Sequence, residues 1–158
     1  MQVSAVFEGT LVGFNTPAGV KKEKMKQEGL STLLIDGAAV GKRFRTVVNT
    51  IEVPLTGKSF KYLFLLAARL FLSDDGWISR FDLDYCPTGT FNYTQYLHSL
   101  RKDMVAAVGE DMAPAIISDQ RGSYRLCVDK PCVKFNFENL MVFQDAEVVK
   151  ITRELRKV

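Results

Sequence analysis

The chain has 158 residues, of which 47% are hydrophobic, 25% charged and 11% aromatic, and its net charge is +3. Roughly 100 to 200 residues make one domain, and this composition excludes disordered, collagen-like and disulfide-scaffold proteins. No apolar stretch approaches the roughly 20 residues of a membrane-spanning helix and no secretory signal follows Met1, so we expect a cytoplasmic protein with no membrane partner.

The sequence offers no set of residues for catalysis. Cys86, Cys127 and Cys132 lack the C-x-x-C spacing of zinc sites, and His98 is the only histidine that could complete a metal site. Neither a nucleophile motif nor a complete phosphate or dinucleotide loop is present. We therefore expect reduced thiols, no cofactor and no enzyme activity.

Residues 1–55 alternate short apolar runs with turn residues, which is typical of β-strands. We predict a small antiparallel sheet packed on the core, with strands near residues 3–7, 11–14, 33–35, 47–48 and 51–53. The period of the apolar residues changes near Pro54, where this region should end.

From Thr56 onward the apolar residues recur at three- and four-residue spacing, which is typical of a helix with one buried face. We predict a helix over residues 57–72, because Thr56 can act as its N-cap. A turn should follow over residues 73–76. Ser79 then caps a very short second helix that ends before Pro87.

A third helix is predicted over about residues 92–108, ending at Gly109. At 100° per residue one side of it is apolar and belongs to the core, formed by Tyr93, Leu97, Leu100 and Met104. The opposite side is small and polar and is free to contact a partner, with Gln95, Ser99, Lys102 and Ala106.

Two alternating runs on either side of Arg121-Gly122 predict a β-hairpin with its turn over residues 118–123 and basic residues near its tip. Another strand is predicted where Val133, Phe135 and Phe137 alternate with other residues.

A last helix is predicted from about Asp145. Its apolar stripe spans barely three turns, which favours packing on its own domain, and the alternative is a two-fold contact in a homodimer. The stripe consists of Val148, Ile151, Leu155 and Val158. The patterns divide one globular unit into residues 1–55, 56–128 and 129–158.

Four segments form a recognisable series: VPLTGKSFKYLFLLAARL (53–70), ISRFDL (78–83), YLHSLRKDM (96–104) and IISDQRGSYRL (116–126). In this order they resemble the winged-helix DNA-binding domain of OmpR/PhoB-type bacterial transcription regulators, over about residues 30–128. The resemblance implies an α+β fold: a winged helix-turn-helix with an N-terminal antiparallel β-sheet, a three-helix core, a C-terminal β-hairpin wing and an extra C-terminal helix.

The resemblance also implies sequence-specific binding to double-stranded DNA, with the helix at about 92–108 in the major groove and the wing at about 118–123 at the minor groove. Asn92 and Gln95 have the geometry to read adenine, Arg101 would hold phosphate, and Arg121 would reach the minor groove. The third helix is expected to make further contacts with DNA through Tyr96, Ser99 and Lys102. Arg125 and, less strongly, the Lys42-Arg43 pair are expected to contact the DNA backbone.

The alternative function is a winged helix that binds a protein partner, such as a component of the transcription machinery, through the polar side of the third helix. Residues 63–112 hold 4 basic and 7 acidic side chains, which favours this alternative. The Arg-Gly wing tip favours DNA. A DNA-binding surface should join its cations in one continuous positive band formed by Arg101, Lys102, Arg121 and Arg125.

Overall fold

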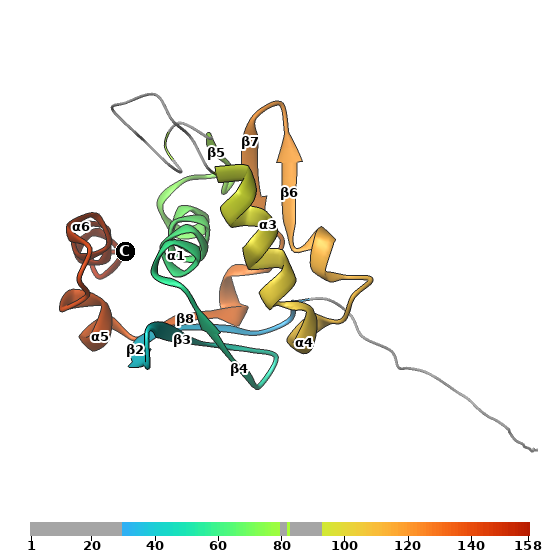
Figure 1. Cartoon of the computed structure of the whole chain (residues 1–158). Coiled ribbons are helices and arrows are strands. Elements are labelled where there is room, and N and C mark those ends of the chain that lie inside the picture. Colours follow the sequence, from blue (N-terminus) through green and yellow to red (C-terminus); the bar gives the residue numbers. More distant parts are fainter. Residues whose placement is uncertain (1–29, 80–81, 83–92) are drawn as a thin grey trace, which may run out of the picture.

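The structure is a computed structural model that describes residues 30–79, 82 and 93–158. It has a mixed α+β architecture in which helices cover a four-stranded sheet and a second, three-stranded sheet stands beside them (Figure 1). The strands predicted at residues 3–7 and 11–14 lie outside the described residues, as does nearly all of the short helix predicted before Pro87.

The four-stranded sheet has the order β4-β3-β2-β8. Its strands are β2 (Leu33–Val40), β3 (Arg43–Val48), β4 (Ile51–Leu55) and β8 (Val133–Phe135). The first three form an antiparallel meander, whereas β8 joins β2 in parallel, with Leu33 opposite Val133. The prediction of a purely antiparallel N-terminal sheet is therefore wrong in one respect, because a strand from near the C-terminus completes it.

Helix α1 (Gly57–Leu72) crosses one face of this sheet and has the predicted bounds. The Thr56 hydroxyl accepts a hydrogen bond of 3.3 Å from the Ser59 amide, as expected of an N-cap. At the other end the Ser73 hydroxyl donates to the Arg69 carbonyl at 2.9 Å and accepts from the Gly76 amide at 3.0 Å, which makes the predicted turn.

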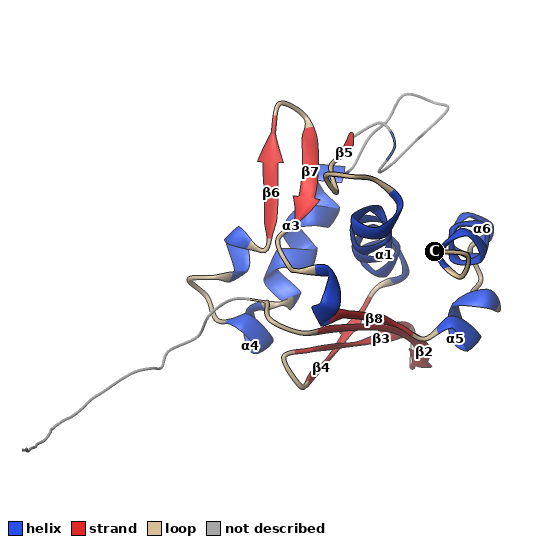
Figure 2. Ribbon diagram, turned by 180° about the vertical axis from the view of Figure 1, so that it is seen from behind, coloured by secondary structure: helices blue, strands red, loops and turns tan. Residues whose placement is uncertain are grey.

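Burial explains why α1 is central to the fold. Ten of its residues are buried, far more than the single apolar stripe of a surface helix would require. It packs on α3 on one side and on α6 on the other, with the sheet beneath it (Figure 2). The largest fully buried side chains of α1 are Phe60, Tyr62, Leu63, Phe64 and Leu66.

The second sheet has the order β5-β7-β6. Its strands are β5 (Ile78–Ser79), β6 (Ile117–Gln120) and β7 (Ser123–Leu126). The hairpin of β6 and β7 was predicted, but β5 was not, since Ser79 was expected only to cap a helix. The Ser79 hydroxyl does accept a hydrogen bond of 3.2 Å from the Asp82 amide, while Ile78 pairs with Tyr124 in the sheet.

The third helix is shorter than predicted, because it breaks at Met104 into α3 (Tyr93–Asp103) and α4 (Val105–Val108). The Met104 amide is shared between the carbonyls of Leu100 and Arg101, at 3.2 and 3.1 Å, so the turn tightens there. Gly109 ends α4 with a φ of 91°, as its position in the sequence indicated.

The C-terminal region differs from the prediction in two details. Phe137 does not end a strand but begins helix α5 (Phe137–Met141), with Asn136 as its N-cap. Helix α6 (Ala146–Leu155) begins after Asp145 and buries Val148 and Leu155, so it packs on its own chain. Val158 was expected on the buried stripe but lies beyond the helix and is 77% exposed.

Two single-turn 3-10 helices, Ala113–Ala115 and Lys130–Cys132, connect these elements. Within the part of the chain that the structure describes, no helix combines the length and the apolar character needed to cross a bilayer.

Candidate nucleic-acid interface

The β6–β7 hairpin and α3 lie side by side on one flank of the molecule. The tip of the hairpin is at the same end as the N-terminal end of α3 (Figures 1 and 2). The two elements were predicted to contact DNA together, and the fold brings them together.

A two-residue turn makes the hairpin tip. Gln120 pairs with Ser123, so the turn is shorter than the predicted 118–123 and consists of Arg121 and Gly122 alone. Both turn residues have positive φ, at 53° and 80°. Two successive positive φ angles are typical of a type I′ turn, which continues the natural twist of the strands. Arg121 is exposed at this tip.

Helix α3 has the two predicted faces. Leu97 and Leu100 are buried, at 2% and 0% exposure. Three polar residues at helical spacing are exposed on the other side, namely Gln95, His98 and Lys102. This face presents an amide, an imidazole and an ammonium group to a partner. Asn92, the other residue expected to read bases, lies outside the described residues.

Tyr96 and Ser99 are half-buried on the side of α3 that turns toward α1. The ring of Tyr96 packs edge-on against the buried Tyr62 ring, with 5.5 Å between centroids and an interplanar angle of 87°. The Lys58 ammonium lies 5.9 Å from both ring centroids. Tyr96 therefore anchors α3 to α1 through its ring.

Two of the four cations expected in the positive band bind backbone carbonyls. The Arg101 guanidinium donates through Nη2 to the Ile117 carbonyl at 2.7 Å. The Arg125 guanidinium donates through Nε to the Asp75 carbonyl at 2.7 Å. Arg101 thus links α3 to the hairpin, and Arg125 links the hairpin to the turn after α1.

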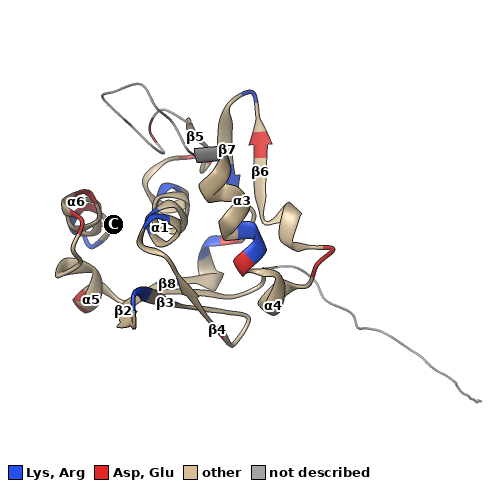
Figure 3. Ribbon diagram, viewed as in Figure 1, with Lys and Arg blue, Asp and Glu red and all other residues tan. Residues whose placement is uncertain are grey.

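Both basic and acidic residues occur along α3 and the hairpin (Figure 3). Lys102 and Arg121 are exposed, but Asp103 follows the first in the sequence and Asp119 lies on the strand just before the second. Two carboxylates therefore accompany the two exposed cations of the expected positive band.

A hollow of about 300 Å³ lies where the first turn of α1 meets α3. The sequence did not predict it, although three of the residues that line it on α3 were predicted to contact DNA, namely Tyr96, Ser99 and Lys102. The signal that could have found it is Ser59, which occupies the position where a capping box carries Glu or Gln.

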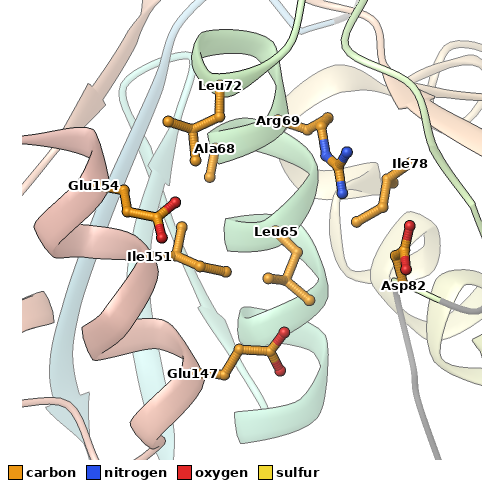
Figure 4. Close-up of a pocket in the computed structure, with 9 residues that line it drawn as sticks. All are labelled: Leu65, Ala68, Arg69, Leu72, Ile78, Asp82, Glu147, Ile151 and Glu154. Atoms are coloured by element: carbon orange, nitrogen blue, oxygen red, sulfur yellow. The ribbon is translucent and has the colours of Figure 1, made fainter.

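A separate groove of about 390 Å³ lies between α1 and α6, with Ile78 and Asp82 at one edge (Figure 4). Its floor is apolar, from Leu65 and Ile151 among others, and its rim carries one guanidinium and three carboxylates. No three His, Cys, Asp or Glu side chains among the described residues are placed to hold a metal ion. The groove thus offers charged and apolar contacts to a ligand.

Lys61 fixes the start of α6 beside this groove. Its ammonium lies 3.1 Å from the Asp145 carboxylate and 3.0 Å from the Glu147 carboxylate. Burial alone would lower the pKa of Lys61, but hydrogen bonds to both carboxylates and their charges outweigh it and raise that pKa. Burial alone would raise the pKa of Asp145, but Lys61 and the amides of the first turn of α6 lower it.

No protein-family model matches this sequence, and comparisons with curated proteins and with solved structures likewise give no match.

Proposed function

We propose that this chain is a cytoplasmic transcription regulator that binds double-stranded DNA sequence-specifically. In this proposal α1, β5, α3 and the β6–β7 hairpin form a winged helix. The order helix, short strand, helix, two-stranded hairpin supports it, as does the pairing of β5 with β7.

One observation carries the proposal: the exposed polar face of α3 lies beside a hairpin that exposes Arg121 at its tip. An α-helix fits the major groove, and an Arg on a narrow projection fits the minor groove next to it. Gln95 is the base-reading residue and Lys102 a phosphate contact. Arg101 and Arg125 act through the framework that they hold.

The first experiment measures binding of the full chain to random-sequence duplex DNA at about 50 mM and about 200 mM salt. A protein that contacts phosphates through a few cations loses affinity as salt rises, because counterions are released on binding. Affinity that falls with salt supports the proposal, and selection from a random library then finds the preferred site. Absence of binding at low salt contradicts it.

A second candidate is a module that binds a protein partner through the same face of α3. The presence of Asp103 and Asp119 near the exposed cations Lys102 and Arg121 favours it, since these carboxylates reduce the positive charge available to attract DNA. The variant Gln95→Ala separates the two candidates. If the chain binds a protein partner through this face, Gln95→Ala should weaken binding of that partner and leave DNA affinity unchanged.

A further inference from the structure

The hollow between α1 and α3 is lined by donors from three elements. Thr56 and Ser59 belong to the N-cap and first turn of α1, Ser99 and Lys102 belong to α3, and Arg43 begins β3. The lining also includes the carboxylate of Asp103, which lies 3.6 Å from the Arg43 guanidinium. Tyr96 completes the lining, so one space is bordered by the three aliphatic hydroxyls, a phenol, two cations and one carboxylate.

The hydroxyl of Ser59 is the most informative group in this hollow. Ser59 is 1% exposed, and its Oγ has no hydrogen-bond partner among the described residues. A buried hydroxyl without a partner costs about 1 to 3 kcal/mol. A group that bears this cost while it lines a hollow is expected to serve a ligand that accepts a hydrogen bond.

The charges around the hollow favour an anion. It lies at the N-terminus of α1, a helix of 16 residues whose macrodipole places partial positive charge there. The Thr56 hydroxyl already accepts from the Ser59 amide, so its hydrogen remains for donation. Lys102 and Arg43 are exposed on the walls, and together they carry one positive charge more than is balanced by Asp103, the carboxylate of the lining.

We propose that this hollow binds a phosphate group. The hydroxyls of Thr56, Ser59 and Ser99 donate to its oxygens, and Lys102 and Arg43 balance its charge. The phosphate comes either from the DNA backbone or from a free phosphate ion. The first source rests on the proposed function, because Lys102 belongs to the face of α3 assigned to DNA. The second source does not.

The test titrates the full chain with inorganic phosphate at constant ionic strength, using chloride as the balancing anion, and follows binding by calorimetry. Wild-type protein should bind phosphate saturably. Ser59→Ala should weaken this binding at least fivefold without lowering the melting temperature, because it removes a buried hydroxyl that has no protein partner. Lys102→Ala should weaken it as well, whereas Lys134→Ala, at an exposed lysine of β8, should not.

Ser73→Ala is the matched control at the opposite end of the same helix. The Ser73 hydroxyl makes two hydrogen bonds within the protein, so its loss should lower the melting temperature and leave phosphate affinity unchanged. Equal phosphate affinity in the wild type and Ser59→Ala overturns the proposal. So does the absence of saturable phosphate binding in the wild type together with unchanged DNA binding by Ser59→Ala.

Duplex DNA distinguishes the two sources. If the phosphate belongs to the DNA backbone, inorganic phosphate competes with DNA at constant ionic strength, and Ser59→Ala weakens both ligands in parallel. If it is a free ion, phosphate binds but neither competes with DNA nor depends on it. If the wild type shows no phosphate site and Ser59→Ala binds DNA as well as the wild type does, the phosphate proposal fails and the proposed DNA-binding function stands. If the protein binds phosphate but not DNA, the phosphate proposal stands and the proposed DNA-binding function fails.

Discussion

The Arg101 guanidinium donates a hydrogen bond of 2.7 Å to the backbone carbonyl of Ile117, which joins the last turn of α3 to the first residue of β6. Its Nε is buried with no hydrogen-bond partner among the described residues. The Arg101 side chain therefore links α3 to the hairpin.

Arg101→Ala should lower the free energy of unfolding by about 1 to 3 kcal/mol, because the Ile117 carbonyl loses its partner. The neighbouring Lys102→Ala should change it by less than about 0.5 kcal/mol, since Lys102 is exposed. In DNA binding the order should reverse: Lys102→Ala should reduce the slope of log affinity against log salt by about 1. Urea titrations and binding isotherms on both variants check this, and equal stability of the two variants would falsify the structural role of Arg101.

Gln95→Ala should lower affinity for the selected DNA site by about 1 to 3 kcal/mol and affinity for random DNA by much less. The reason is that a side-chain amide can form paired hydrogen bonds with adenine, whereas phosphate contacts are the same on every sequence. Fluorescence anisotropy with both duplexes measures the difference. Lys134→Ala, at an exposed lysine of β8 and outside the face of α3, is the control for non-specific effects of a substitution. Equal losses on both duplexes would contradict base reading by Gln95.

Arg121 has a positive φ of 53°, a conformation that Asn and Gly adopt at lower cost than Arg. Arg121→Asn should therefore leave the melting temperature unchanged or raise it, while it weakens DNA binding by removing the charge at the hairpin tip. Thermal denaturation and anisotropy measure the two effects. A variant that loses stability and keeps DNA affinity would show that Arg121 serves the turn and not a ligand.

The Lys61 cluster makes stability depend on pH at both extremes. The pKa of Asp145 is lowered in the folded state, so its contribution is present above about pH 4 and is lost as pH falls through the lowered value. The pKa of Lys61 is raised, so its contribution is present below about pH 10.5 and is lost as pH rises through the raised value.

Lys61→Met should remove the alkaline dependence and reduce the acid one, because the amides of Glu147 and Val148 still lower the pKa of Asp145. It should lower stability at pH 7 by about 1 kcal/mol or less, because Lys61 keeps part of its side chain in solvent. Lys150→Met, at an exposed lysine of α6, is the control. Urea midpoints between pH 3 and pH 11 provide the test. If the urea midpoint varies with pH in the same way for the wild type and Lys61→Met, the cluster makes no measurable contribution to the pH dependence of stability.

Local signals in the sequence predicted what depends on neighbours along the chain. The bounds of α1, the Thr56 N-cap and the Arg121-Gly122 turn all follow from residues within a few positions of one another. The parallel pairing of β8 with β2 and the formation of the short β5 depend on partner strands far along the chain. One sequence alone does not indicate which distant strands pair or in which register.

The same distinction applies to the candidate site. The polar face of α3 was predictable from its period, and Gln95 and Lys102 are exposed there. The hydrogen bond from Arg101 to Ile117 was not predictable, because it depends on where the hairpin docks. The hollow at Ser59 was missed for the same reason: it forms only where α1, α3 and β3 meet.

The parallel strand β8 also determines when this protein can finish folding. The Asn136 amide donates to the Asp36 carboxylate at 3.0 Å across 100 residues of sequence. At roughly 5 to 20 residues per second, a ribosome needs about 5 to 20 s to synthesise that interval. Throughout this time β2 keeps an unpaired edge, which is open to pairing with another chain. A nascent or prematurely terminated chain that ends before Val133 thus lacks the strand that covers this edge in the folded protein.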